Sequence, residues 1–276
     1  PLGDKLKRIA TMQRIEQINC LHQKVIVKIT KALKSEGIPV VFMKGQTTAL
    51  RYPNPLHRTP GDIDFVVNPK DFKKTMEILE KIGKVDYDLV HEHHGMAWVD
   101  GVTVEPHYKV HNYQSPSTDY AMQEMFASVF PSELSSADMD GYAVPVFPPT
   151  FESVFLISHM VNHVYEEGLG LRQVIDYAMF LSSCADKIDW LQHHEYLHQM
   201  HMERAWRIFT CICVDYLEMP LPSQVEPFSH QEKMWAENMM TDIMRVGNFG
   251  RGEYVIHHRG LKDAFNNYCW VAKRCW

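Results

Sequence analysis

The sequence lacks the patterns that mark several specialised classes of protein. Six cysteines are scattered through its 276 residues with no Cys-X-X-Cys pair and no zinc-knuckle spacing, so we expect reduced, mostly buried thiols. There is no run of eighteen apolar residues, and no charged leader precedes an apolar stretch at the start. We therefore expect neither a membrane span nor a signal peptide, no membrane partner, and a cytoplasmic location.

An excess of positive charge is also missing. The chain has 28 Lys and Arg residues against 34 Asp and Glu residues, which gives a net charge of -6, and its pI is near 6.2. Proteins that wrap nucleic acid carry a basic surface, so this balance argues against long nucleic acid as a partner. No internal repeat or low-complexity tract is present, whereas 45% apolar residues suffice for a full core. These features predict a globular protein with one large or two smaller domains.

The first half of the chain alternates between extended and helical patterns. Apolar residues recur at helical spacing before and after short β-branched runs, and Gly or Pro residues separate the segments. In chain order, we expect a helix over 4–36, a strand within 38–45, a helix within 46–53, a strand over 62–68, a covering helix over 69–83 and a hairpin within 87–110. Residues 112–147 contain Ser-Pro and Phe-Pro pairs and predict an irregular connection with some strand content.

The pattern changes near Pro148, where helical periodicity replaces strands and glycine turns. We therefore predict an α/β domain with an N-terminal helix over 1–147 and a helical domain over 148–276. In the helical part, His159 and His163 are four residues apart, so they share one helix face as metal ligands or as hydrogen-bonded histidines. The histidines of "QHHEYLHQMH" are expected at the surface of their helix.

Two aspartates one residue apart open the strand predicted over 62–68. Residues two apart on a strand point to the same face, so Asp62 and Asp64 face the same way. Two like charges beside an apolar run repel one another and resist desolvation unless a cation lies between them. Mg²⁺ binds such oxygen ligands, and Mn²⁺ is also suitable. The alternative is that both carboxylates extend into solvent from the end of the strand.

The predicted hairpin carries a third carboxylate. Asp100-Gly101 favours a two-residue type I′ turn, and that turn fixes the pairing of the two strands. The resulting register places Glu105 and His107 on one face, with His94 directly opposite His107. Three acidic ligands on neighbouring strands can hold two Mg²⁺ ions about 3.5 to 4 Å apart, as two-metal phosphoryl or nucleotidyl transfer requires.

Three segments follow one another in an informative order: "VVFMKGQTTALRYPNPLHRTPGDIDFVV", then "VTVEPHY", then "FESVFLISHMVNHVYEEGLGLRQVIDYAMFL". With them, the chain resembles the uncharacterised nucleotidyltransferase family of the DNA polymerase β-like superfamily over roughly residues 38–185. In that superfamily a glycine turn opens a helix, one strand carries an Asp-X-Asp pair, and a neighbouring strand supplies a third acid. Gly45, Asp62, Asp64 and Glu105 match those places.

The resemblance implies an α/β (α+β) fold, in which a small mixed sheet flanked by helices forms a nucleotidyltransferase-like catalytic domain and a C-terminal helical module follows. It implies a metal-dependent enzyme that moves a nucleoside monophosphate from an NTP, such as ATP, to a hydroxyl-bearing acceptor and releases pyrophosphate. Asp62, Asp64 and Glu105 would hold two Mg²⁺ ions, and Glu105 would complete the site or act as a base. The acceptor is a small molecule or a macromolecule; a sugar, an antibiotic, a nucleic-acid end and a protein side chain all remain open.

Further residues are candidates for binding the nucleotide. Lys44, beside the turn residue Gly45, could place its ammonium on a β- or γ-phosphate or could instead be solvated at the strand end. Arg58, in the following loop, is the stronger candidate for a phosphate contact. Arg172 matches the "GLRQ" segment of the family, which would direct it to the active cleft. The superfamily often has Gly-Gly or Gly-Ser at the turn, whereas this chain has Gln46 after its glycine.

Two other functions remain open. The departure at Gln46 is compatible with a catalytically silent protein of the same fold that binds a nucleotide or a partner. A metal-dependent phosphohydrolase could instead use the three acids together with His94 and His107 to hold Mn²⁺ or Zn²⁺.

Overall fold

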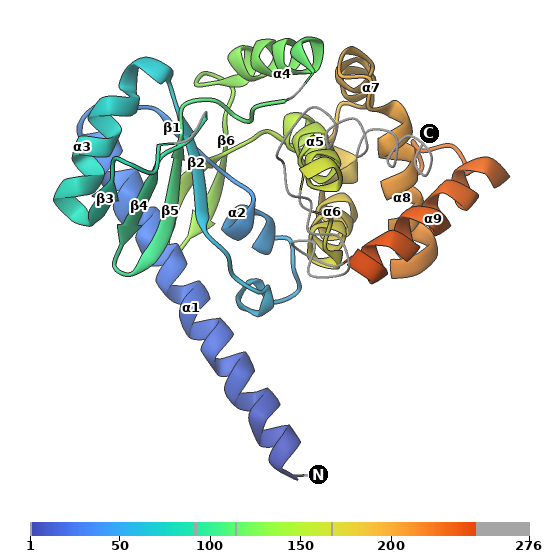
Figure 1. The fold of residues 1–276 in the computed structure, drawn as a ribbon, viewed down its shortest axis with the longest axis horizontal. Helices are drawn as coiled ribbons and strands as arrows, with labels where there is room; N and C mark the ends of the chain where they lie inside the picture. Colours follow the sequence, from blue (N-terminus) through green and yellow to red (C-terminus); the bar gives the residue numbers. More distant parts are fainter. Residues whose placement is uncertain (1, 91–92, 114, 167, 247–276) are drawn as a thin grey trace. The chain divides into compact units, whose positions relative to one another are not determined.

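A mixed sheet of seven strands organises the first of the two units into which the chain divides, Pro1–Pro148 and Pro149–Trp276 (Figure 1). The computed structural model describes residues 2–90, 93–113, 115–166 and 168–246. The strands are β1 Val40–Met43, β2 Ile63–Val67, β3 Lys84–Asp86, β4 Met96–Val99, β5 Val102–His107, β6 Ser135–Met139 and β7 Tyr142–Val146. Their order in the sheet is β3-β4-β5-β2-β1-β7-β6, and β2 pairs in parallel with β5, as β1 does with β7. This is the mixed α/β architecture that the sequence predicts.

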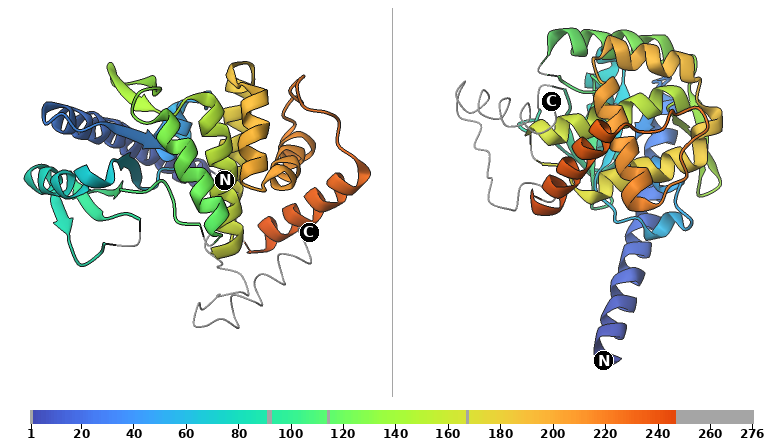
Figure 2. Two further views of the ribbon diagram at one scale, coloured as in Figure 1. Left: turned by 90° about the horizontal axis from the view of Figure 1, so that it is seen from above. Right: turned by 90° about the vertical axis from the view of Figure 1, so that its right-hand side faces the viewer.

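Two helices cover one face of this sheet. The helices of the first unit are α1 Leu2–Ser35, α2 Gly45–Ala49, α3 Phe72–Ile82 and α4 Pro116–Val129, with 3-10 turns at Pro55–His57 and Pro69–Asp71. The apolar stripes of α1 and α3 pack against alternate strand residues, among them Phe42 and Phe65, whose ring centroids lie 5.4 Å apart. Burial of each such side chain contributes about 1.5 to 3 kcal/mol. The N-terminal part of α1 extends beyond the sheet (Figures 1 and 2), and residues 3–14 are exposed.

Asp-Gly turns close two hairpins of the sheet. Asp100-Gly101 has φ of 50° and 81°, and Asp140-Gly141 has φ of 53° and 73°, as type I′ turns require. The first turn pairs β4 with β5 in the register predicted from the sequence, and His94 lies opposite His107 as expected. Because side chains alternate along a strand, Glu105 and His107 point away from α1 and α3, while Val102 and Val104 face the core.

Residues 112–147 are more regular than the sequence analysis predicted. They form α4 and the β6–β7 hairpin, and β7 joins the sheet beside β1. The expected strand content is confirmed by β6 and β7, whereas the expectation of an irregular connection was wrong because the segment also contains the helix α4. Ser115 is the N-cap of α4, accepting a hydrogen bond from the Thr118 backbone N–H, and Pro116 occupies the first helical position.

The described part of the second unit is helical, as expected. Its helices are α5 Pro149–Glu166, α6 Leu171–Cys184, α7 Trp190–Gln199, α8 Glu203–Leu217 and α9 His230–Val246, with a 3-10 turn at Ala185–Lys187. The core of this unit is rich in fully buried aromatic side chains, among them Phe151, Phe155, Tyr177, Phe180 and Phe209. No described helix of the chain is long and apolar enough to span a membrane.

The expected surface position fails for one histidine of α7. His193 is fully buried, and its ring centroid lies 5.2 Å from that of Trp190. Leu191, an apolar residue on another face of the same helix, is 84% exposed. The buried stripe contains His193, Tyr196 and Leu197, which recur at helical spacing.

The thiols are reduced in the described part of the chain. Cys184, Cys211 and Cys213 are buried, and Cys20 is half-buried, in agreement with the expectation from the sequence. Cys269 and Cys275 lie outside the described residues.

Candidate active site

Strand register brings the acidic residues together. Asp64 of β2 pairs with Met43 of β1 on one side and with Glu105 of β5 on the other. Asp62 immediately precedes β2 and is half-buried. A shallow recess is lined by Asp62 and Asp64 together with residues of α2 and the end of β1, including Lys44. Three carboxylates from the central strands of the sheet therefore converge on the face opposite α1 and α3.

Asp64 contacts a histidine and a lysine. His107 Nε2 lies 3.1 Å from Asp64 Oδ1, and Lys44 Nζ lies 3.0 Å from the same oxygen. The Nε2 atoms of His107 and His94 each lie 3.8 Å from Glu105 Oε2. Asp64, Glu105 and His107 offer three ligand atoms within 4.8 Å of one another. This donor set has the oxygen-rich character that suits Mg²⁺ or Mn²⁺.

The three acids perturb one another's pKa. Burial, followed by the charges of Asp64 and Asp62, raises the pKa of Glu105 to about 8. The charge of Asp64, followed by burial, raises the pKa of Asp62. Burial also opposes ionisation of Asp64, but the Lys44 charge and the His107 hydrogen bond outweigh it and lower the pKa of Asp64. The group therefore carries a proton near neutral pH, and a divalent cation would remove the repulsion that holds it there.

The Lys44 ammonium is the cation closest to Asp64. Burial lowers the pKa of Lys44, but the charges of Asp64, Asp62 and Glu105 outweigh burial and raise it. Its side chain is 21% exposed, so the solvated position considered from the sequence is not the one observed. Lys44 provides the positive charge that allows Asp64 to stay ionised while buried.

Unusual backbone geometry positions this lysine. Lys44 has φ 57° and ψ -161°, and Gly45, the first residue of α2, has φ 46°. A residue other than glycine in this region costs of order 1–3 kcal/mol, so the surrounding structure must enforce the conformation. A Cβ added to Gly45 would lie 3.4 Å from the Asp62 carbonyl oxygen. That distance is an ordinary van der Waals contact, so the positive φ, rather than a lack of space, favours glycine at this position.

Polar residues on α1 hold the loop that precedes β2. Asn19 Nδ2 donates to the carbonyl oxygens of Leu56 and Arg58, at 2.6 and 2.8 Å, and His22 Nε2 lies 2.8 Å from the Gly61 carbonyl oxygen. Asn19 Oδ1 accepts from Gln46 Nε2 at 2.7 Å. The sequence analysis missed Asn19 and His22, because their only signal is polarity on an otherwise buried helix face.

Gln46 therefore has a structural role in this chain. It is buried, and its hydrogen bond to Asn19 ties α2 to the α1 anchor of the loop. The side-chain amide of the glutamine at this turn thus has a hydrogen-bond partner on α1.

The two arginine candidates lie in different surroundings. Arg58 is buried, and its Nη1 donates to the Thr59 carbonyl oxygen at 3.2 Å. Arg172 lies in the first turn of α6, in the second unit. On α5 of that unit, His159 and His163 share a helix face with ring centroids 4.4 Å apart. The nucleotide-binding roles of both arginines remain predictions.

A model of the uncharacterised nucleotidyltransferase family matches residues 4–218, well over half of the chain. The chain belongs to this nucleotidyltransferase family. The match extends beyond the segment recognised in the sequence, at both ends, and includes most of α1 as well as α5 to α8. The fold of the first unit agrees with this membership.

Solved structures give weaker similarities. The antibiotic-resistance factor ANT(2'')-Ia in solution matches with a TM-score of 0.46 and 14% identity, over 66% of this chain and 95% of that one. A crystal structure of ANT(2'')-Ia with adenylyl-2''-tobramycin gives 0.45 and 13%, over 65% and 98%. An antigenic nucleotidyltransferase-like protein from Paracoccidioides brasiliensis gives 0.40 and 14%, over 67% and 91%. No curated protein matches the chain.

Proposed function

We propose that this protein is a metal-dependent nucleotidyltransferase, which moves a nucleoside monophosphate from an NTP to a hydroxyl group of an acceptor and releases pyrophosphate. The observation that carries the proposal is the convergence of Asp62, Asp64 and Glu105 at the centre of the sheet, in a chain that belongs to a nucleotidyltransferase family. A surface cluster of acids would have ordinary pKa values. The raised pKa of Glu105 supports the proposal, because a bound cation would relieve the burial and the repulsion that cause it.

The three acids would bind two Mg²⁺ ions, or Mn²⁺ ions, through their oxygen atoms. Such ions activate the attacking hydroxyl and neutralise charge on the triphosphate and the leaving pyrophosphate. Asp62 and Asp64 would contact both ions, and Glu105 would complete the set or accept the proton of the acceptor hydroxyl. His107, which lies 3.1 Å from Asp64, would hold that carboxylate in place as a positioning residue.

The phosphates of the NTP would be bound by Lys44, Gly45, Arg58 and Arg172. Lys44 is already held at the acidic site by Asp64, within reach of any phosphate bound there. Gly45 would let the backbone of the turn approach the nucleotide. On this proposal residues 1–147 form the catalytic domain, and residues 148–276 form a helical domain that carries Arg172.

The acceptor is a small molecule or a macromolecule that presents a hydroxyl group. The net charge of -6 disfavours a long nucleic acid, because the chain as a whole offers no excess of positive charge to its phosphates.

The test combines NTP binding with pyrophosphate release. The full chain is mixed with Mg²⁺ and labelled NTPs, first alone and then with a panel of hydroxyl-bearing acceptors. We expect metal-dependent binding that Asp62→Asn and Asp64→Asn abolish. The matched control is Asp140→Asn, at an exposed hairpin turn with φ 53° where asparagine is well tolerated, and it should behave as the wild type. Unchanged binding in the two active-site variants would end the proposal.

The same experiment separates the alternatives. Tight NTP binding without pyrophosphate release across the whole panel would favour the catalytically silent binding protein. Release of phosphate or of the monophosphate without any acceptor would favour the phosphohydrolase, which the position of His107 and His94 beside Glu105 makes chemically reasonable.

A further inference from the structure

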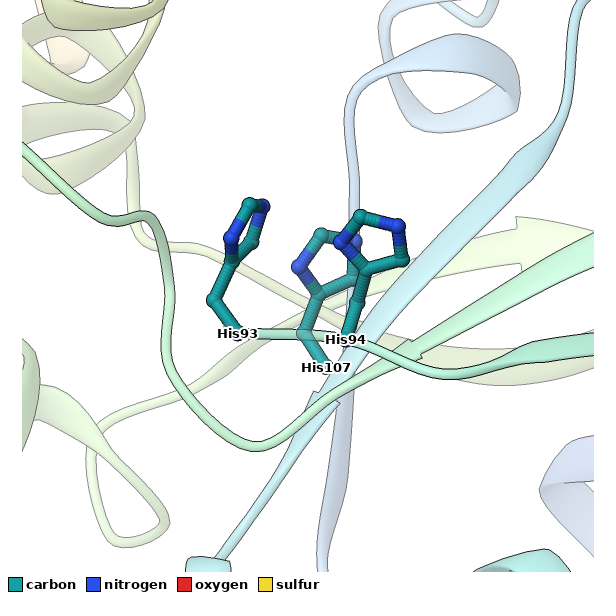
Figure 3. Close-up of side chains that lie close together, drawn as sticks. All are labelled: His93, His94 and His107. Atoms are coloured by element: carbon teal, nitrogen blue, oxygen red, sulfur yellow. The ribbon is translucent and has the colours of Figure 1, made fainter. Parts of the chain in front are cut away.

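Three histidines gather beside the acidic site, on strands that pair with one another (Figure 3). His93 and His94 lie one residue before β4, separated from it by Gly95, and His107 is the last residue of β5. His94 and His107 are directly bridged, and the His93 carbonyl oxygen accepts a 3.0 Å hydrogen bond from the Tyr108 backbone N–H. Backbone pairing therefore fixes the two segments, and the three imidazoles extend to the same side of the sheet.

The three rings are mutual neighbours. Their centroids lie 4.5 Å apart for His93 and His94, 5.0 Å for His94 and His107, and 5.4 Å for His93 and His107. One ring nitrogen of each lies within 4.8 Å of the others. A tetrahedral zinc ion with Zn–N bonds of about 2.0–2.1 Å separates its nitrogens by roughly 3.4 Å. Rotation of the side chains would shorten the nitrogen separations from at most 4.8 Å toward that spacing, with no change in the strand register.

His107 is arranged as metal-bound histidines are. Its Nε2 lies 3.1 Å from Asp64 Oδ1, and an ionised carboxylate only accepts, so the proton belongs on Nε2. Nδ1 then carries a lone pair. That atom is buried, in a side chain 2% exposed, and has no hydrogen-bond partner among the described residues. A carboxylate that fixes the tautomer of a histidine, whose other nitrogen binds metal, is the usual outer shell of a zinc site.

We propose that His93, His94 and His107 form a binding site for a transition-metal dication of the zinc class, distinct from the acidic site that would take Mg²⁺. Imidazole nitrogens suit Zn²⁺, Co²⁺, Ni²⁺ and Cu²⁺, whereas Mg²⁺ prefers oxygen. Asp64, whose carboxylate lies 3.1 Å from His107 Nε2, supplies negative potential next to the three neutral ligands. A stacked histidine surface without metal would account for the ring contacts, but not for a buried, unpartnered nitrogen aimed away from its carboxylate.

The site would connect the segment before β4 to the end of β5. It would also be linked to the acidic site, because His107 contacts Asp64 directly. The existence of the histidine site does not depend on the nucleotidyltransferase proposal, and it can be tested without nucleotide.

The test measures metal binding by the EDTA-treated full chain. Zn²⁺ is titrated by competition with a chromophoric chelator, and Co²⁺ is added in a parallel sample to report tetrahedral nitrogen coordination through its visible absorption. We expect one tight equivalent of Zn²⁺ and an intense Co²⁺ spectrum. His93→Ala and His94→Ala should each weaken Zn²⁺ binding at least tenfold and abolish the spectrum, and Zn²⁺ should raise the melting temperature of the wild type but not of these variants.

Matched variants separate the histidine site from its neighbours. His198→Ala removes a side chain that is 80% exposed in the second unit and should leave Zn²⁺ binding unchanged. Asp64→Asn keeps all three imidazoles but removes the carboxylate partner, and should weaken binding about 10- to 100-fold. Circular dichroism identifies any variant that fails to fold. His93 and His94 are half-buried, so their alanine variants test Zn²⁺ binding without a substitution at the buried His107.

Three results would overturn the proposal. The first is wild-type protein that binds no Zn²⁺ more tightly than His93→Ala does. The second is Zn²⁺ binding that Glu105→Gln abolishes and His93→Ala leaves intact. That result would place the ion among Asp64, Glu105 and His107 instead. The third is a tight equivalent that survives the His93 and His94 variants but is lost on mutation of His159 or His163.

Discussion

Binding of Mg²⁺ at the acidic site should release a proton from Glu105. The pKa of Glu105 is raised to about 8 by burial and by the charges of Asp64 and Asp62. At pH 7 a carboxyl with this pKa is ~0.9 protonated, and at pH 9 only ~0.1. A metal ligand must give up its proton, so metal affinity rises with pH until Glu105 is ionised in the free protein. The apparent affinity should therefore increase about tenfold between pH 7 and pH 9.

The assay is proton release on saturation with Mg²⁺, followed with a pH indicator in weakly buffered solution. We expect about 0.9 proton per chain at pH 7 and about 0.1 at pH 9, with the pH dependence abolished in Glu105→Gln. An exposed acid outside the site serves as the control, and Glu36→Gln, at the surface beside Lys74, should leave the release unchanged. Saturable binding at pH 7 without proton release would show that Glu105 is already ionised and would refute the reasoning. Equal release from Glu105→Gln would assign the proton to another group.

Two further predictions follow from the same site. Lys44→Ala and Lys44→Gly both remove the ion pair with Asp64, but only glycine relieves the backbone strain at φ 57°. In urea unfolding, Lys44→Gly should therefore be more stable than Lys44→Ala by about 1–3 kcal/mol. Equal stabilities would show that the backbone conformation is unstrained. In metal-free protein, Glu105 keeps its proton above pH 7 in the folded state, whereas it loses that proton near pH 4.5 in the unfolded chain. The free energy of unfolding should therefore fall by about 1 kcal/mol from pH 7 to pH 8. It should not fall in Glu105→Gln.

The register of the β4–β5 hairpin was predictable because a local signal controls it. A type I′ turn needs positive φ at both central residues, and Asp100-Gly101 meets that requirement. Once the turn is fixed, the alternation of the strand determines that Glu105 and His107 share a face. Asp140-Gly141 carries the same turn signal, but the β6–β7 hairpin that it closes was not predicted. An Asp-Gly turn is therefore a local signal from which the pairing of the two strands beside it can be predicted.

The surroundings of the acids were not predictable in the same way. Asn19 lies 37 residues from Leu56 and contacts it only through the packing of α1 against the loop before β2. Nothing local in the sequence marks such a long-range hydrogen bond. The ion pair of Lys44 with Asp64 likewise depends on the antiparallel pairing of β1 with β2, which places Met43 opposite Asp64. Contacts of this kind follow from strand order in the sheet, and single-segment patterns do not determine strand order.

The position of Lys44 has a consequence for the order of binding events. Its ammonium lies 3.0 Å from Asp64 Oδ1, where a metal ion would bind the same carboxylate. A dication and an ammonium about 4 Å apart would repel by roughly 8 kcal/mol at an effective dielectric constant near 20. This repulsion opposes metal binding at Asp64 while the ion pair persists, so release of Lys44 from Asp64 would favour metal entry. The released ammonium would then be drawn to the most negative group nearby, which is the triphosphate that arrives with the metal. A lysine that neutralises Asp64 in the free protein would in this way become a phosphate ligand only when metal and nucleotide bind together.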